Sequence, residues 1–402
     1  MCTGGIHITT FNIVHLSTGH AGGAGLAARR LNAALNEEGV PSFFYALESS
    51  DFVLDSNEFI IKRSLFARAL SAIVVRAQAK LSSKILFSLI STRAISKRNV
   101  LALAKTEYTV FHIHNWYNLI PESQIYEIAK SGFPVVVTLH DQRLLTGGCH
   151  YTFDCTKFTN GCLNCPTIHQ GFKWVPKRVF DKREKLLSDN SEQPPWLTYI
   201  SPSRWMRSES MKSNSSSRVS NVFIPNILGP SFKSARFDKT RTSGKKLRIG
   251  IASMDPNSFV KGGDIVLKLR SMAKEKNSQF ELLFLIDFSL SPEEIGAFWS
   301  QIDYLLVSSR ADNSPNVIHE AHHYGVPVIA SQVGGISELL ITGFDHPIPL
   351  EEMSAANLES YFRSISSSEL PFRNMQQVRS EITRYSNGAI QAHINLYKSF
   401  FE

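Results

Sequence analysis

The chain contains no long uninterrupted hydrophobic segment. None of its 402 residues lies in an apolar run of about 18, the length that a membrane-spanning helix requires. Residues 1–5 show no basic patch followed by an apolar core, so we expect no signal peptide. Without export, the five cysteines would remain reduced, which argues against a disulfide framework. These absences predict a cytoplasmic protein without a membrane-spanning helix.

The composition also lacks the features of a disordered or nucleic-acid-binding chain. Hydrophobic residues make up 43% of the sequence and charged residues 19%, which is normal for a globular protein. A net charge of +8 favours anionic partners. Because no recognised nucleic-acid-binding motif accompanies this charge, we expect no nucleic-acid partner. The length suits two or three domains.

Acidic residues are absent between Ile60 and Val100, whereas basic residues are frequent there. The nine basic residues of this window are Lys62, Arg63, Arg68, Arg76, Lys80, Lys84, Arg93, Lys97 and Arg98. Apolar residues are interleaved with them at helical spacing. This basic amphipathic segment, residues 60–100, is suited to lie on an anionic membrane surface with its apolar side inserted. The alternative is a pair of surface helices whose apolar side packs on its own domain.

Short apolar strands alternate with helical segments, a pattern typical of parallel α/β sheets. A first series of expected strands covers residues 12–16, 110–114, 135–140 and 196–201, and a second series covers 247–251, 281–286, 304–307 and 326–330. Between the two series, the serine-rich residues 208–220 and the polar residues 229–246 have the composition of loop and linker.

We therefore predict two doubly wound α/β domains of similar size. The N-terminal domain would cover residues 1–229 and the C-terminal domain residues 230–385, followed by a helix at 386–402 that could cross back to the first domain. Two such sheets normally face each other across a cleft and bind ligands at the carboxyl ends of their strands.

The candidate site of the second domain lies where an expected strand leads into a helix, at residues 308–321. Pro315 suits the first helical turn, which would leave the amides of Asn316, Val317 and Ile318 pointing out of the helix start, toward a phosphate. Glu320, one turn further in, could accept hydrogen bonds from a sugar diol, and Asp312 precedes the helix. The alternative is that Asp312 caps the loop and Glu320 is exposed.

Two glycine-containing turns accompany this segment at the same expected sheet edge. Lys261 is followed by Gly262 and Gly263, so its ammonium group could neutralise a diphosphate that approaches the backbone closely. Gly334 and Gly335 form a turn into another helix start. Each feature alone is a weak signal, but three at one edge predict a binding site.

These motifs together resemble those of retaining glycosyltransferases of family 4, which have the GT-B fold. The resemblance lies in residues 312–321, in 325–331 and in 334–336. It implies that Asp312 contacts the donor sugar, that Glu320 binds the ribose, and that Lys261 holds the diphosphate and assists its departure. The chain departs from the family in having Asp rather than Glu at position 312. It also has no Arg or Lys in residues 254–260.

The N-terminal half extends this resemblance. The glycine loop at residues 20–25, with Gly22 and Gly23, resembles the family loop that lies over the diphosphate. It lacks the Gly-x-Gly-x-x-Gly fingerprint, so a Rossmann dehydrogenase is disfavoured. Residues 112–116, 134–141 and 224–226 also match family segments. The resemblance implies that His140 approaches the transferred sugar, and we expect His114 and Asp141 on the acceptor side.

Four cysteines occur within residues 146–166, with the spacing Cys-x5-Cys-x6-Cys-x2-Cys. They are Cys149, Cys155, Cys162 and Cys165. Such thiolates suit a structural zinc, with free thiols and a redox role as alternatives. A subset of these transferases associated with bacterial surface polysaccharides has a similar block. A closed zinc site would stiffen the loop beside His140 and would supply no Lewis acid.

The sequence thus predicts retaining transfer from a nucleotide diphosphate sugar to a glycan or lipid-linked acceptor, without a catalytic cofactor. We expect a role in cell-surface polysaccharide biosynthesis and a peripheral location on the inner face of the cell membrane. One alternative is a GT-B nucleotide-sugar epimerase, which would need acid and base groups for proton abstraction. Another is a non-catalytic partner in a polysaccharide assembly complex.

Overall fold

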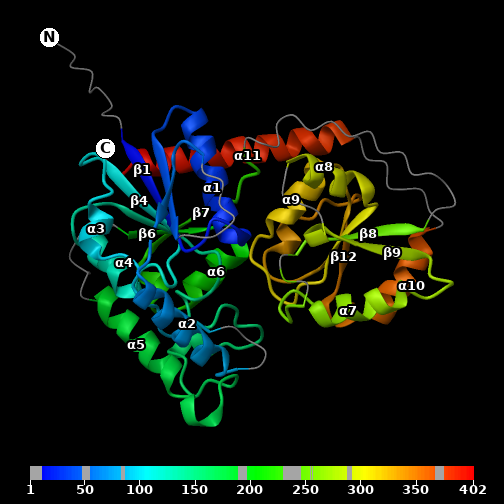
Figure 1. The fold of residues 1–402 in the computed structure, drawn as a ribbon, viewed down its shortest axis with the longest axis horizontal. Coiled ribbons are helices and arrows are strands. Elements are labelled where there is room, and N and C mark those ends of the chain that lie inside the picture. The colour runs from blue at the N-terminus through cyan, green and yellow to red at the C-terminus, as the bar shows by residue number, and fades with distance from the viewer. Residues whose placement is uncertain are drawn as a thin grey trace. The chain divides into compact units, whose positions relative to one another are not determined.

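The computed structural model describes residues 11–47, 55–82, 87–188, 197–229, 246–253, 255, 257–287, 292–366 and 375–402. By their contacts, the described residues divide into two compact units, and Figure 1 shows the elements of each. The first unit lies within residues 1–201, 209–224 and 389–402, and the second within 202–208 and 225–388. The predicted linker at 229–246 falls almost wholly outside the described residues.

The first unit is built on a seven-stranded parallel sheet with the order β3-β2-β1-β4-β5-β6-β7. Its strands are β1 Asn12–Ser17, β2 Ser42–Leu47, β3 Glu58–Ile61, β4 Thr109–Asn115, β5 Val135–Thr138, β6 Leu197–Ser201 and β7 Ser220–Phe223. The central strands β1, β4 and β5 are buried almost throughout, as expected for a parallel sheet covered on both faces.

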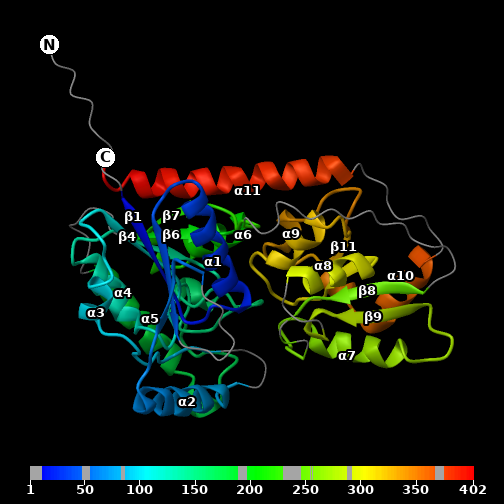
Figure 2. The ribbon, with the colours of Figure 1, turned by 45° about the horizontal axis from the view of Figure 1, so that its top comes forward.

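The helices of the first unit are α1 Gly22–Glu37, α2 Leu65–Ala79, α3 Lys97–Leu101, α4 Glu122–Ala129 and α5 Val175–Ser188. Short 3-10 turns occur at Lys157–Asn160, Gln170–Phe172 and Ser216–Arg218. Two helices contribute to both units: α6 Arg204–Lys212 and α11 Met375–Lys398. Figure 2 shows α2 along one edge of the first unit. None of the helices in the described residues is long and apolar enough to span a bilayer.

The serine-rich segment differs from the sequence-based expectation. Residues 208–220 were predicted as loop and linker, but most of them belong to the first unit and end at its edge strand β7. The buried Ser213 hydroxyl donates to the Leu145 carbonyl at 2.7 Å, and the Ser216 hydroxyl donates to the Ser210 carbonyl at 2.6 Å. Small hydroxyl side chains fit a tight packed turn because they satisfy neighbouring carbonyls.

The second unit contains a five-stranded parallel sheet with the order β12-β11-β10-β8-β9. Its strands are β8 Leu247–Ile251, β9 Phe280–Phe284, β10 Tyr304–Val307, β11 Val328–Ser331 and β12 His346–Ile348. Its helices are α7 Gly263–Met272, α8 Pro292–Gln301, α9 Asn316–His323 and α10 Ala355–Ser366, with 3-10 turns at Leu285–Asp287, Ile336–Glu338 and Leu350–Glu352.

Strand β10 separates the two hydrophobic clusters of the second unit. Leu305 and Val307 belong to the cluster that includes residues of α8 and α9, whereas Tyr304 and Leu306 belong to the cluster that includes residues of α7 and α10. Because side chains alternate along a strand, the two clusters cover opposite faces of the sheet. Two parallel sheets with helices confirm the predicted fold class, although β2, β3, β7 and β12 were not predicted.

Candidate functional site

A lysine and an aspartate meet at the carboxyl edge of the second sheet. Lys261 precedes α7, in the connection that follows β8, and Asp312 follows the neighbouring strand β10. Their Nζ and Oδ2 atoms are 2.5 Å apart. Asp312 is buried and its Oδ1 accepts from the Asn313 amide at 2.9 Å, whereas the Lys261 side chain is 39% exposed. The ammonium group therefore has a fixed partner on one side and access to solvent on the other.

Close backbone approach at two glycines shapes this pair of loops. Gly262 has φ +74°, and a Cβ there would lie 2.2 Å from the Ser308 carbonyl oxygen. A Cβ on Gly335 would lie 1.8 Å from the Asn313 carbonyl oxygen. A side chain at position 262 would push apart the loops that carry Lys261 and Asp312, and one at position 335 would push the 334–335 turn away from the Asp312 loop, so both positions require glycine.

Arg310 is a residue whose role the sequence analysis missed. Its guanidinium donates to both Asp264 carboxylate oxygens at 2.6 and 2.9 Å and lies 4.2 Å from the centroid of the Phe259 ring. Its backbone amide donates to the Val260 carbonyl at 2.7 Å. Hydrogen bonding from Arg310 holds the pKa of Asp264 below its usual value. Arg310 thus fixes the loop before Lys261, and its position directly after β10 was the available signal.

Helix α9 begins beside Asp312, with Pro315 at its N-cap. The Ile318 amide donates to the Pro315 carbonyl at 3.1 Å, so it does not point outward as the sequence predicted. The Asn226 side chain donates to the Ser314 carbonyl at 3.1 Å and to Asn316 Oδ1 at 3.0 Å, and thereby fixes the helix start. Glu320 is 6% exposed, so the alternative of a solvated glutamate is wrong.

The glycine turn at Gly334–Gly335 leads into a 3-10 turn of three residues rather than a longer helix. Its Glu338 side chain accepts from the amides of Arg204 and Trp205 at 2.8 and 2.6 Å. These amides belong to the first turn of α6 and need an acceptor. Glu338 therefore caps a helix, whereas Gly335 lies against Asn313 at the candidate site.

The glycine loop of the first unit places two exposed glycines at the start of α1. Gly22 and Gly23 are exposed, and a Cβ on either would meet no described atom within 4 Å. No side chain of the described residues caps this helix at Ala21, and its first turn contains no acidic residue. Gly25 instead is structural, because a Cβ there would lie 2.4 Å from the Gly19 carbonyl oxygen. The exposed helix start can thus attract an anion.

Three histidines form a hydrogen-bonded row at the carboxyl ends of β1, β4 and β5. His15 Nδ1 lies 3.0 Å from His114 Nε2, and His114 Nδ1 lies 3.2 Å from His140 Nε2. Burial lowers the pKa of His15 to about 3 and that of His140 to about 4, and it holds the pKa of His114 well below its usual value. All three rings are therefore neutral at pH 7, with one N–H each.

The end of the row decides which nitrogen of each ring carries the proton. His15 Nε2 is buried and has no hydrogen-bond partner among the described residues. A buried N–H without an acceptor is less favourable than a bare ring nitrogen, so the proton of His15 belongs on Nδ1. His15 then donates to His114, and His114 Nδ1–H donates to His140 Nε2. His140 consequently presents Nδ1–H, which makes it a hydrogen-bond donor rather than a base.

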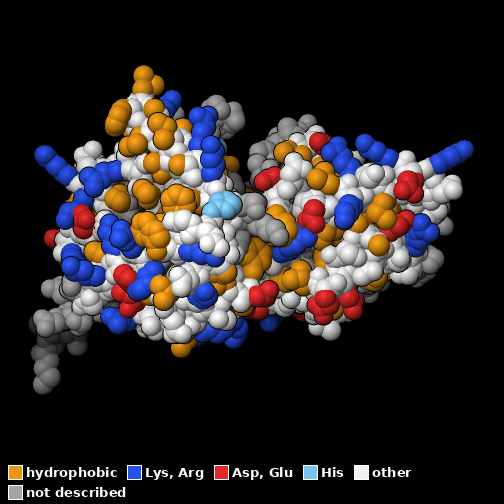
Figure 3. All heavy atoms as spheres, turned by 90° about the horizontal axis from the view of Figure 1, so that it is seen from below, with side chains coloured by type: hydrophobic (Ala, Val, Ile, Leu, Met, Phe, Trp, Pro, Cys, Tyr) orange, Lys and Arg blue, Asp and Glu red, His pale blue; other side chains and the backbone are white. Residues whose placement is uncertain are grey.

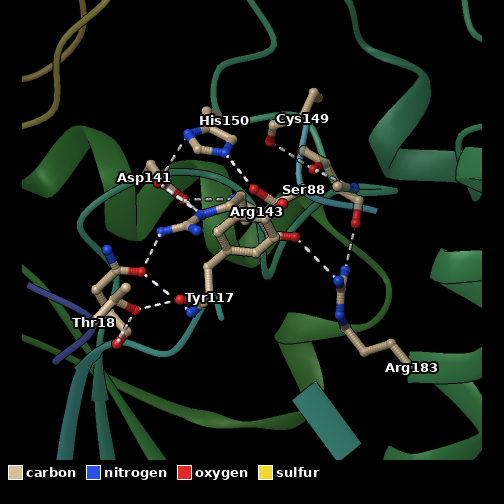
Figure 4. Close-up of polar contacts among 11 residues, drawn as sticks. Thr18, Ser88, Tyr117, Asp141, Arg143, Cys149, His150 and Arg183 are labelled. Atoms are coloured by element: carbon tan, nitrogen blue, oxygen red, sulfur yellow. Dashed lines mark hydrogen bonds and ion pairs between the residues drawn. The ribbon is translucent and has the colours of Figure 1, made fainter. Parts of the chain in front are cut away.

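Asp141 lies between two basic groups, as Figure 4 shows. Arg143 Nε lies 2.9 Å from both carboxylate oxygens, and His150 Nδ1 lies 3.5 Å from Oδ2. Burial alone would raise the pKa of Asp141, but Arg143 and His150 outweigh it and hold this pKa below its usual value. Arg143 also donates to Asn115 Oδ1 at 3.1 Å. Asp141 is thus an ionised group that organises its neighbours.

Arg183 of α5, which the sequence did not predict as a functional residue, holds the backbone of this loop in place. Its side chain is 1% exposed and is paired with Glu122. It also donates to the carbonyls of Arg143 and Thr146 at 3.0 and 2.5 Å. A buried guanidinium needs such partners, and here they fix the backbone between Asp141 and the cysteine-rich residues.

The four cysteines of residues 146–166 are free thiols that line one pocket. No three of their sulfur atoms lie within 4.8 Å of one another; in the described residues only His15, His112 and His114 bring three ligand atoms that close. His112 and His114 use both ring nitrogens in hydrogen bonds, so this trio is a packed network. Burial raises the pKa of Cys162 to about 11, while the Gly147 amide lies 3.1 Å from its sulfur.

The segment that carries Lys261 and Asp312 is similar to a known protein family. Residues 260–360 match the family model described as Glycosyl transferases group 1. The matched segment contains Lys261, Asp312, Glu320 and Gly335. Within this segment the chain is similar to the group 1 glycosyl transferases. WcaC of Escherichia coli (strain K12), whose name describes a colanic acid biosynthesis glycosyl transferase, is 26% identical over 255 residues. That match spans 58% of this chain and 62% of WcaC.

Solved structures extend the likeness beyond residues 260–360 to both units. Sucrose-phosphate synthase from Thermosynechococcus elongatus is 13% identical, with a TM-score of 0.60 over 97% of this chain and 99% of that one. The pneumococcal O-GlcNAc transferase GtfA, solved with UDP and GlcNAc, is 9% identical, with a TM-score of 0.57 over 98% and 99%. At these identities the likeness concerns the fold, which is GT-B.

Proposed function

We propose that this chain is a glycosyltransferase that moves a sugar from a nucleotide diphosphate sugar to a glycan or lipid-linked acceptor, in polysaccharide biosynthesis. The pairing of Lys261 with buried Asp312 beside the start of α9, within the segment that matches the group 1 family model, is the observation that supports it most strongly. The name of WcaC supports the polysaccharide pathway, and the UDP complex of GtfA supports a nucleotide donor.

In this proposal each candidate site residue of the second unit has a separate role. Lys261 holds the diphosphate and stabilises it as it departs, because its exposed side can reach a ligand while Asp312 fixes its position. Asp312 accepts hydrogen bonds from the donor sugar, and Glu320 accepts them from the ribose. Asn316 and Val317 belong to the helix start that faces the phosphates. Gly335 keeps the loop close to Asp312.

The first unit contributes the acceptor side in the same proposal. His140 donates a hydrogen bond through Nδ1 to a hydroxyl of the transferred sugar. His114 orients His140, and Asp141 orients Arg143. Gly22 and Gly23 allow the diphosphate to approach the start of α1. No metal or other catalytic cofactor takes part, because lysine and helix-start amides supply the positive charge.

We further propose that the reaction retains the configuration of the donor sugar. Asp312 is engaged by Lys261 and by the Asn313 amide, so it is a poor covalent nucleophile. The acceptor hydroxyl would then attack from the face that the diphosphate leaves. Proton NMR of the sugar first released from an α-linked donor by hydrolysis tests this: an α product supports retention, and a β product contradicts it.

The donor site is tested by thermal shift with a panel of UDP-, ADP-, GDP- and dTDP-sugars. One donor at about 100 times its Kd should stabilise the wild type by about 2.7 kcal/mol. Lys261→Ala and Glu320→Ala should lose this shift, and the exposed Lys268→Ala of α7 should keep it. If no nucleotide sugar stabilises the wild type, the proposal fails. Interconversion of donors without release of nucleotide diphosphate would indicate an epimerase instead.

The cysteine pocket fits a structural zinc in its donor set, though binding would require the loop to draw the sulfurs together. We propose that Cys149, Cys155, Cys162 and Cys165 hold such an ion. Zinc would neutralise thiolates that burial otherwise disfavours. Its role would be to stiffen residues 146–166 beside Asp141.

A further inference from the structure

Helix α2 is oriented in the opposite way to an ordinary surface helix. A surface helix normally buries its apolar stripe and exposes its polar face. In α2 the buried residues are Ser71 and Gln78, each 6% exposed. Phe66 is 78% exposed, Ile73 64% and Leu70 42%. These three lie at positions i, i+7 and i+4, so they form one apolar stripe that faces away from the first unit.

A buried amide fixes this orientation. Gln78 Nε2 donates to the Tyr117 hydroxyl at 2.7 Å and to the Ile90 carbonyl at 3.0 Å. Gln78 Oε1 accepts from the amides of Leu89 and Ile90 at 2.5 and 2.8 Å. A rotation of the helix that buried its apolar stripe would break all four bonds inside the protein, at a cost for each unsatisfied group. The outward stripe is therefore built into the fold.

The charged residues of the segment that carries the stripe are all basic. Arg76 and Lys80 follow Phe66 by ten and fourteen residues, so they border the stripe along the same side of the helix. Both are exposed, and no Asp or Glu occurs between residues 60 and 100. Figure 3 shows hydrophobic side chains on a projection of the first unit, with Lys and Arg beside them.

A second segment with exposed aromatic residues adjoins the end of α2. The His169 amide donates to the Leu81 carbonyl at 3.2 Å. Shortly after His169, Phe172 is 50% exposed and Trp174 is 48% exposed. Tryptophan and phenylalanine are enriched where proteins meet the interface of a bilayer.

We propose that α2 docks the first unit on an anionic lipid surface. Phe66, Leu70 and Ile73 enter the boundary between headgroups and acyl chains, while Arg76 and Lys80 contact lipid phosphates. A second copy of this chain is a less suitable occupant, because two such faces would bring together basic residues without an acidic partner. This inference does not depend on the proposed transferase activity, although a membrane surface is where a lipid-linked acceptor would be presented.

Co-sedimentation of the full chain with phospholipid vesicles tests the proposal. We expect binding to vesicles of phosphatidylcholine with 30% phosphatidylglycerol, weaker binding to pure phosphatidylcholine, and a decrease with added salt. Phe66→Ser/Ile73→Ser and Arg76→Glu/Lys80→Glu should each lower the partition constant by roughly tenfold or more. The matched controls Leu267→Ser and Lys268→Glu, exposed residues of α7, should bind like the wild type.

Folding and self-association are measured on the same proteins. Unchanged unfolding midpoints of the two α2 double variants show that a loss of vesicle binding is not a loss of structure. Absence of binding by the wild type, or equal binding by wild type and both variants, overturns the proposal. A wild-type dimer that Phe66→Ser/Ile73→Ser dissociates, without vesicle binding, assigns the face to a second copy and also overturns it.

Discussion

His114 Nδ1 lies 3.2 Å from His140 Nε2, and the other nitrogen of His114 lies 3.0 Å from His15. The buried His15 thereby determines which nitrogen of His140 carries the proton, although the ring of His114 lies between them. We expect nitrogen-15 NMR of labelled histidine to show His140 protonated on Nδ1 at pH 7. An Nε2–H signal for His140 in the wild type would contradict the direction assigned to the row.

Replacement of His114 should expose this dependence. In His114→Phe, His140 Nε2 loses its donor and its tautomer is no longer fixed, so the transfer rate should fall by about fivefold or more, the worth of one neutral hydrogen bond. The nitrogen-15 signature of His140 should change together with kcat. A lower kcat with an unchanged signature would show that His114 acts only through packing.

Asp312→Asn should separate donor binding from transfer. The substitution keeps the shape of the side chain but removes its charge, so Lys261 becomes available to the diphosphate. We expect the thermal shift by the donor to persist or increase, while kcat falls by roughly 10- to 100-fold because the sugar loses a charged acceptor. Glu281→Gln, at an exposed position of β9, is the control. An unchanged kcat would show that Asp312 has no role in sugar transfer.

Gly335→Ala tests the close contact at the candidate site. The new methyl group would meet the Asn313 carbonyl oxygen at 1.8 Å, so the free energy of unfolding should fall by about 1–3 kcal/mol and donor binding should weaken. Gly388→Ala is the matched control because nothing lies within 4 Å of its Cβ position in α11. It should be neutral or stabilising by up to about 1 kcal/mol. Equal effects in urea denaturation would argue against a required glycine at 335.

Acid should destabilise the first unit over a defined range. Burial lowers the pKa of His15 to about 3 and those of His140, His150 and His393 to about 4, below the usual value of 6.5. The unfolded chain therefore binds more protons between pH 6.5 and pH 4, and the free energy of unfolding should decrease as pH falls through that range. The Asp141 carboxylate beside His140 and His150 contributes only at lower pH. Urea denaturation at pH 7.0, 5.5 and 4.5 measures how steeply the free energy of unfolding changes with pH.

His15→Phe should reduce that slope, because it removes one group that protonates only on unfolding. The slope lost for one histidine cannot exceed about 1.4 kcal/mol per pH unit. A free energy of unfolding that does not change between pH 7.0 and 4.5 in the wild type would mean that these rings are already charged in the folded protein.

The zinc proposal predicts one zinc per chain after purification without chelators. Cys162→Ser should lower both the zinc content and the thermal stability, whereas Cys2→Ser, outside the cluster, should change neither. Substoichiometric zinc in the gently prepared wild type would overturn the assignment and leave four free thiols, of which two are buried.

Local patterns predicted much of the second unit. Strands at Leu247–Ile251 and Tyr304–Val307 were located to the residue because each is a short apolar run bounded by polar residues. The rule that parallel strands end at one edge predicted that Lys261 and Asp312 lie at the same edge of the sheet, whereas their pairing is seen only in the structure. Family resemblance supplied their chemical roles.

Contacts between residues far apart in the sequence could not be predicted from local patterns. Periodicity showed that α2 has an apolar side, but only the contacts of Gln78 reveal that this side faces outward. The pairing of Arg310 with Asp264 joins residues 46 positions apart. The short edge strands β3 and β12 carry polar or proline residues that mask the strand pattern, and buried serines gave the appearance of a linker.

The C-terminal helix α11 contacts His112 of β4, beside the histidine row, and this contact bears on when the first unit can finish folding. The hydroxyl of Tyr397 bonds to Nδ1 of His112, 285 residues earlier, and His393 lies in the same cluster. The hydrogen bond between His112 of β4 and Tyr397 therefore cannot form until residue 397 has left the ribosome. A nascent chain interrupted at residue 388 would lack Tyr397 and His393, so it would expose the His112 imidazole and core surface that chaperones and proteases recognise.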